Sequence, residues 1–175
     1  DLSEQERWER TLQNLERISS ALRQYKEERQ LLPGRSAQGR GLLSWRVELL
    51  PYLGYGDLYS QFDLTAPWDS PQNKKLLPYI PPEFQSPERF DKRTNYLLVT
   101  GPGACGNGAM ADRYIEDGPQ NTVYLVEADE VTATDWTKPQ DFAFSPSAAA
   151  RNVGKLRGGT LVVLADLAIR VVPPQ

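Results

Sequence analysis

Residues 3–30, SEQERWERTLQNLERISSALRQYKEERQ, predict one long amphipathic helix. Ser3 followed by Glu6 is a capping-box pattern that marks the start of a helix, and Pro33-Gly34 is expected to end it. At this length the helix measures about 40 Å. It lies across a sheet of its own domain or, alternatively, its end near Trp8 projects and meets a partner. A single apolar stripe follows from spacings of three and four residues: Trp8, Leu12, Leu15, Ile18, Leu22 and Tyr25.

The rest of the chain predicts a loop-rich connector followed by a sheet. Ser44 and Ser70 are each expected to cap a short helix, and 57–62 resembles a helical turn. Four later runs are typical of strands: 94–100, 122–128, 160–166 and 168–173. The links between them show no crossover helix, so we expect a roughly four-stranded antiparallel sheet with long irregular loops. The predicted fold is a single α+β domain over residues 1–175. It consists of an N-terminal helix (3–30), a connector (31–93) and a sheet (94–173).

Composition excludes several classes of function. The chain has 175 residues, a net charge of −3, one cysteine and no histidine. Nucleic-acid binding needs clustered Lys and Arg, and no basic run exists. Without histidine, Ser–His and Cys–His nucleophile pairs cannot form. No apolar run of about 20 residues is present, and we expect any membrane or targeting segment to precede Asp1.

The run GPGACG at 101–106 matches G-x-G-x-x-G after a predicted strand, and Glu127 follows at a suitable distance. A dinucleotide site would need this run to open a helix, and the following residues have no helical periodicity. We therefore interpret the segment as a flexible loop between strands. Cys105 is expected to be exposed there, but no histidine can activate it, so catalysis by this thiol is not predicted.

Acidic residues gather in two segments, which are interpreted first as solvated loop charge. Asp112, Glu116 and Asp117 are retained as an alternative calcium site, because carboxylates and loop carbonyls are calcium ligands. A hydrolase site is a further alternative, because glycosidases use carboxylate pairs. Its candidate residues are those of both segments: Asp112, Glu116, Asp117, Glu127, Asp129, Glu130 and Asp135.

Tryptophans lie in several segments that resemble loops. They either fix the loops onto a small core, because each buries a large area, or present a surface to a partner. The candidate interaction residues are the tryptophans and the leucine that follows Trp8 on the helix: Trp8, Leu12, Trp45, Trp68 and Trp136.

Several motifs together resemble a known family: LLSWRVELLPYL (42–53), PWDSPQNKKLLPYIPPEFQSP (67–87), TNYLLVTGPG (94–103) and DWTKPQDF (135–142). In this order they are similar to domain of unknown function 1559 of planctomycete-type bacteria, whose members resemble type II secretion pseudopilins and type IV pilins. The resemblance implies a pilin-like fold and an exported protein of the periplasm, cell envelope or cell surface. Members carry a C-terminal His, nine residues and Asp-Gly. Here Asp166 matches, but Leu156 and Leu167 replace the His and Gly, so the turn at 166–168 is expected to change.

The function predicted from these observations is a non-catalytic, pseudopilin-like assembly or protein-interaction domain. Its partners would be other subunits or neighbouring domains that contact the N-terminal helix, with no nucleic acid and no cofactor. Membrane contact would come only from a segment absent from this chain. The alternative is an extracellular module that binds carbohydrate or another small ligand through the Trp-rich loops, with calcium as a possible stabiliser.

Overall fold

The computed structural model describes residues 1–145, 153 and 158–173. Its helices are α1 (Glu4–Arg29), α2 (Trp45–Leu49), α3 (Gly56–Tyr59) and α4 (Pro71–Lys74). Its strands are β1 (Arg93–Thr94), β2 (Tyr96–Thr100), β3 (Val123–Glu127), β4 (Thr134–Asp135), β5 (Phe142–Ala143), β6 (Thr160–Leu164) and β7 (Ile169–Val172). Short 3₁₀ turns link them: η1 (Ala37–Gly39), η2 (Leu50–Leu53), η3 (Leu77–Tyr79), η4 (Pro82–Phe84), η5 (Asp112–Tyr114), η6 (Pro119–Asn121) and η7 (Glu130–Thr132). The predicted α+β class is confirmed.

The long helix α1 forms where the sequence predicts it. The Ser3 side chain accepts a hydrogen bond from the Glu6 backbone N–H, and the Glu6 carboxylate accepts one from the Ser3 N–H, so the capping box is complete. The helix ends within one residue of the predicted Gln30, before Pro33-Gly34. Gln30 adopts φ 61°, a left-handed cap, and its N–H bonds the Lys26 carbonyl at 2.8 Å.

The sheet contains the four predicted strands and one more. Its order is β5-β2-β3-β6-β7, and β2, β3, β6 and β7 pair antiparallel in sequence order. The expectation of a purely antiparallel sheet is wrong, because β5 pairs parallel with β2, through Val99 opposite Phe142. No crossover helix is needed, because β3 comes between β2 and β5 in the sequence and runs antiparallel to β2. The chain therefore returns to the starting end of β2 before β5 begins. The two-residue strands β1 and β4 form a separate antiparallel pair.

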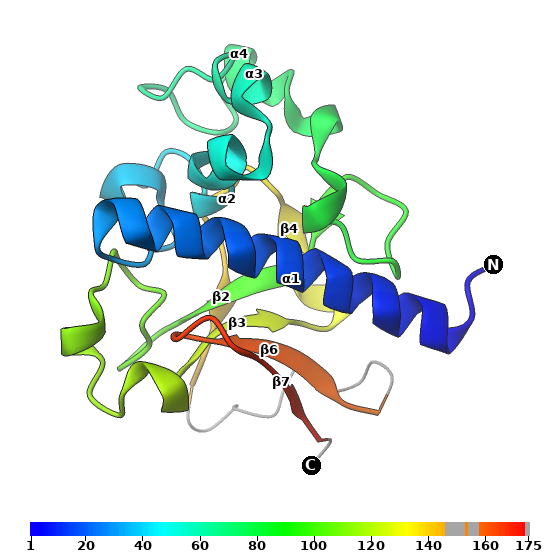
Figure 1. Cartoon of the computed structure of the whole chain (residues 1–175). Helices are drawn as coiled ribbons and strands as arrows, with labels where there is room; N and C mark the ends of the chain where they lie inside the picture. The colour runs from blue at the N-terminus through cyan, green and yellow to red at the C-terminus, as the bar shows by residue number, and fades with distance from the viewer. Residues whose placement is uncertain (146–152, 154–157, 174–175) are drawn as a thin grey trace.

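Helix α1 lies between the sheet and the helical connector (Figure 1). It contacts α2, η2 and η4 of the connector, and β6 of the sheet. Its inward face is buried from the third turn onward, through Thr11, Leu15, Ile18, Ser19, Ala21, Leu22 and Tyr25. A smaller apolar cluster includes Leu97, Val126, Phe142 and Val162.

The connector forms the short helices that its serines predict. Ser44 accepts a hydrogen bond from the Arg46 N–H at the start of α2, and Ser70 accepts one from the Asn73 N–H at the start of α4. The turn expected at 57–62 is present as α3. None of the helices in the described part of the chain is both long enough and apolar enough to cross a membrane.

Candidate functional site

A buried ion pair joins the connector to the sheet. The Arg46 guanidinium on α2 lies 2.8 Å from an oxygen of the Asp141 carboxylate, which immediately precedes β5, and neither side chain is exposed. Burial raises the pKa of Asp141 to about 6, against the lowering effect of the Arg46 charge. Burial also lowers the pKa of Arg46, again opposed by its partner. With no exposed atoms, the pair holds segments together and does not contact a ligand.

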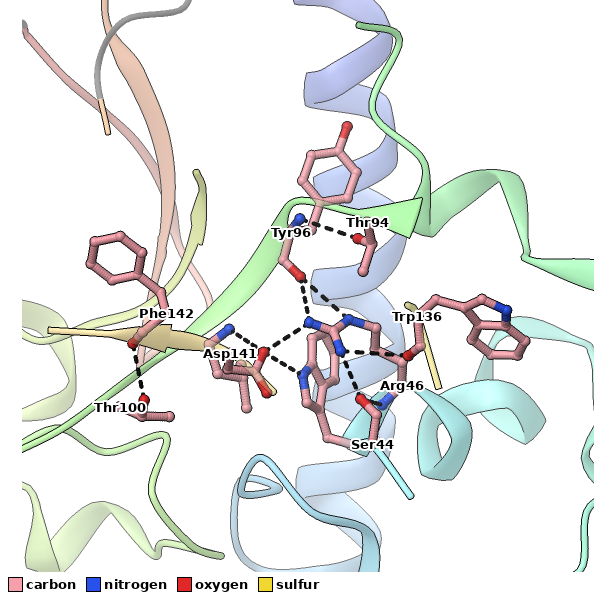
Figure 2. Close-up of polar contacts among 10 residues, drawn as sticks. Ser44, Arg46, Thr94, Tyr96, Thr100, Trp136, Asp141 and Phe142 are labelled. Atoms are coloured by element: carbon pink, nitrogen blue, oxygen red, sulfur yellow. Dashed lines mark hydrogen bonds and ion pairs between the residues drawn. The ribbon is translucent and has the colours of Figure 1, made fainter. Parts of the chain in front are cut away.

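The other hydrogen bonds of this pair connect three segments (Figure 2). Arg46 donates to the Tyr96 carbonyl on β2 at 3.0 Å and to the Ser44 hydroxyl at 2.8 Å. The bonded Asp141 oxygen also accepts from the Leu98 N–H at 2.8 Å and from the indole of Trp45 at 3.2 Å. The two motifs SWR and DWTKPQDF, which suggested the family resemblance, therefore meet in space.

Three glutamates that are mostly buried form hydrogen bonds or an ion pair with residues of α1. Glu48 accepts from the Tyr25 hydroxyl at 3.1 Å. Glu83 lies 3.1 Å from the Arg17 guanidinium. Glu127 accepts from the Ser86 hydroxyl at 3.1 Å and from the α1 hydroxyl of Thr11 at 3.4 Å. These contacts begin at the third turn of α1 and hold the rest of the helix against the connector and the sheet.

The first turns of α1 lie outside this network. From Glu4 to Arg10 no residue is fully buried, and Arg7 makes an ion pair with Glu88 at 2.9 Å. The segment at 82–90 lies beside this part of the helix. The two enclose an open groove of about 700 Å³ that is lined by Asp1, Leu2, Arg7, Arg10, Gln13, Asn14, Pro82, Gln85, Ser86, Pro87, Arg89 and Phe90.

The predicted interaction residues fall into two groups. Trp45 and Trp136 are fully buried, and their indole N–H groups bond Asp141 and the Leu77 carbonyl. Neither can stack on a sugar or contact a partner in this structure, because the inward packing that gives each its large buried area leaves no exposed surface. Trp8, Leu12 and Trp68 are partly buried against the core. The Lys138 ammonium lies 5.4 Å from the centre of the Trp68 ring.

Hydrogen bonds join the G-x-G-x-x-G segment to β2 and bridge its two ends. Gly106 bonds the Val99 carbonyl through its N–H, and the Asn107 side chain bonds both backbone groups of Gly101. A Cβ atom on Gly106 would lie 2.3 Å from the Val99 oxygen, so the close approach requires glycine. The expectation of an exposed Cys105 is wrong, because this loop folds its thiol inward. Burial raises the pKa of Cys105 to about 11, so the thiol stays protonated near neutral pH.

The calcium candidates do not assemble. Asp112 forms an ion pair with Lys26 at 2.7 Å, while Glu116 and Asp117 are exposed. Within the described ranges no three His, Cys, Asp or Glu side chains come together as a possible metal site. The finding on metal sites also covers the second acidic segment, where Glu127 and Asp129 are buried and Glu130 is exposed.

The turn at 166–168 keeps the conformation that suits glycine, so the expectation of an altered turn is wrong. Leu167 adopts φ 69° and is buried. The Leu167 carbonyl accepts from the Ser19 hydroxyl at 2.6 Å and from Arg23 at 3.2 Å, both on α1. Core packing and these two bonds offset the strain of a left-handed leucine. The other substituted position, Leu156, lies outside the described residues.

Sequence reasoning missed Arg46, Asp141 and Phe90. Arg46 and Asp141 lie inside two Trp-containing motifs that carried the family resemblance. Their opposite charges were the available signal that the two motifs pair. Phe90 is 94% exposed. It follows a proline-dense stretch without periodicity, so nothing in the sequence marked this exposure.

The architecture defines an α+β domain in which a long N-terminal helix covers a mixed sheet. The chain belongs to the family described as "Protein of unknown function (DUF1559)", whose model matches residues 12–162. Comparisons with curated proteins and with solved structures found no match.

Proposed function

We propose that this DUF1559 domain is a non-catalytic, pseudopilin-like assembly domain of the cell envelope, which binds other subunits or a neighbouring domain through the N-terminal end of α1. The observation that carries the proposal is the pattern of burial along the helix. Full burial begins at Thr11, and within Glu4–Arg10 only Arg7 and Trp8 are partly buried, Trp8 against the core. A capped and regular helix end that its own core covers only in part is suited to packing against a neighbour.

The chemistry of this end supports a protein partner. Leu2, Trp8 and Leu12 are partly exposed apolar residues, and polar side chains surround them. Interfaces commonly use an aromatic anchor inside a polar rim. The outward face of the later turns is charged, as at Glu16, Arg23 and Glu27, so the contact is expected at the helix end and not along its whole length.

A non-catalytic role is supported by the side chains present. The sequence has no histidine, and its single thiol is buried and protonated near neutral pH. The buried Arg46–Asp141 pair has no exposed atoms with which to contact a substrate. The cell-envelope location is part of the proposal and rests on the resemblance to pilin-like proteins.

Size-exclusion chromatography with light scattering tests self-association of the full-length protein, and a crosslinking pull-down tests other partners. Trp8→Ser should weaken the association by about tenfold, because burying a large apolar side chain contributes about 1.5–3 kcal/mol. Tyr79→Ser, at an exposed position on η3, is the matched control and should leave it unchanged. A wild-type protein that stays monomeric and captures no partner contradicts the proposal.

A further inference from the structure

The loop that follows β2 is closed by one side-chain amide, that of Asn107. Its Oδ1 accepts from the Gly101 N–H at 2.8 Å. Its Nδ2 donates to the Gly101 carbonyl at 2.7 Å and to the Ala104 carbonyl at 3.0 Å. Cys105 lies between these points of attachment and is 2% exposed. The Asn107 amide therefore joins the two ends of the loop that holds the thiol inward.

Asn107 also has the sequence context in which an asparagine amide is most labile. It is followed by Gly108, and no other asparagine of the chain precedes a glycine. Because glycine has no Cβ atom, its backbone nitrogen is open to approach by the preceding side chain. Both residues are exposed, and no hydrogen bond to a described residue engages the Gly108 N–H. This nitrogen is therefore available as a nucleophile.

The hydrogen bonds of the Asn107 amide affect its reactivity in opposite directions. Attack on the Asn107 Cγ places negative charge on Oδ1, and the Gly101 N–H already donates to that oxygen, so it stabilises the charge. The two bonds from Nδ2 oppose the reaction, because the nitrogen gives them up when it leaves. The loop thus brings together a nucleophile, a polarised carbonyl group and access for water.

We propose that Asn107 is a deamidation site, and that its conversion opens the loop and uncovers Cys105. The Gly108 nitrogen loses its proton to water or hydroxide and forms a bond to the Asn107 Cγ. The Cγ–Nδ2 bond then breaks, and the nitrogen takes up a proton and leaves as ammonia. Water hydrolyses the resulting succinimide ring at either of its two carbonyls. The product at position 107 is aspartate or isoaspartate.

Neither product can close the loop as the amide does. A carboxylate has no N–H, so the bonds to the carbonyls of Gly101 and Ala104 are lost, and a negative charge faces those two oxygens. Isoaspartate also adds a carbon atom to the backbone, which displaces the side chain from both partners. The loop should therefore open more often and expose Cys105 to solvent. The proposal does not rest on assembly through α1, because it concerns a single copy of the chain.

Peptide mapping by mass spectrometry tests the modification itself. The folded full chain is kept at mildly alkaline pH, and each asparagine is followed for the mass gain of deamidation. Asn107 should convert faster than Asn121, an exposed asparagine that precedes Thr122. Gly108→Ala should slow the conversion several-fold, and its added Cβ has open space, so the loop stays closed. Equal rates at Asn107 and Asn121, or no slowing in Gly108→Ala, overturns the proposal.

Labelling of Cys105 tests the consequence, because it is the single thiol of the chain. A maleimide should label the deamidated protein and Asn107→Asp about tenfold faster than wild type, since losing two hydrogen bonds shifts a loop-opening equilibrium by this order. Asn121→Asp is the matched control and should label at the wild-type rate. Equal labelling of wild type and Asn107→Asp overturns the proposal. Circular dichroism separates loop opening from global unfolding: fast labelling of a folded Asn107→Asp supports the proposal, and fast labelling that needs loss of the folded spectrum overturns it.

Discussion

The Arg46 guanidinium lies 2.8 Å from the Asp141 carboxylate, and neither side chain has exposed surface. The two residues are far apart in sequence, on the connector and just before β5. Their ion pair is one of the contacts that fix the connector against the sheet. A buried pair of this kind costs desolvation when it forms, and far more when one partner is removed.

Removing one partner should destabilise the protein strongly. Arg46→Met or Asp141→Leu should each lower the free energy of unfolding by about 3–5 kcal/mol, because the charged group that remains stays buried without its partner. The double variant Arg46→Met/Asp141→Leu should cost less than the sum of the single changes. Urea denaturation measures each value. Lys26→Ala, which removes the partly exposed pair with Asp112, is the control and should cost about 1 kcal/mol or less. If each single variant loses as little unfolding free energy as this control, the pair does not hold the connector and the sheet together.

Stability should depend on pH through Asp141. Its folded pKa of about 6 lies above its ordinary value of 3.8, so the folded state favours the protonated form. The stabilising contribution is therefore complete below about pH 4 and is lost as the pH rises through about 6. The difference in unfolding free energy between wild type and Asp141→Asn should decrease over this range. Burial also raises the pKa of Glu48, which remains in both proteins and cancels in the difference. A difference that does not change with pH contradicts this assignment.

The left-handed turn at Leu167 should reverse the usual order of alanine and glycine. Both Leu167→Ala and Leu167→Gly lose a buried side chain and should be less stable than wild type by about 2–4 kcal/mol. At φ 69°, glycine relieves backbone strain, so the glycine variant should be the more stable of the two by about 1 kcal/mol. Thermal or urea unfolding measures the order. At Leu161, a buried residue of β6 without a positive φ, alanine should be better than glycine. The same order at both positions would argue against a left-handed Leu167.

The loop at 101–106 should be intolerant of a methyl group at Gly106. Gly106→Ala should destabilise the protein by about 1–3 kcal/mol, because the new Cβ would lie 2.3 Å from the Val99 oxygen. Gly56→Ala is the control. It has open space around the added atom and lies in α3, so it should be neutral or stabilising by up to about 1 kcal/mol. Chemical denaturation of the two variants compares them. Equal stability would mean that the loop yields, as the flexible loop of the sequence prediction would.

Local patterns account for the parts of the fold that the sequence predicts. The capping box and the periodicity of α1 depend on residues three and four apart, and β2, β3, β6 and β7 are continuous β-type runs. The parallel strand β5 has only two residues, so no pattern marks it. Its pairing with β2 is a tertiary contact between distant segments.

The candidate site was less predictable because its decisive features are not local. The burial of Trp45 and Trp136 results from packing between the connector and the sheet, and Trp136 forms edge and stacked ring contacts with Phe62 and Phe84. A tryptophan in an irregular segment looks the same in sequence whether it faces inward or outward. How far the core covers the helix end at Trp8 is a tertiary feature, which only the three-dimensional structure defines.

Site-directed crosslinking from position 8 tests the central proposal most directly. A photoreactive amino acid replaces Trp8 in the full-length protein in cells that express it, and in a matched strain it replaces the exposed Tyr79. The assembly account predicts a discrete crosslinked species, to a second copy or to another subunit, from position 8 and not from position 79. The account is contradicted if the protein with the probe at position 8 stays uncrosslinked, or gives the same diffuse products as the control.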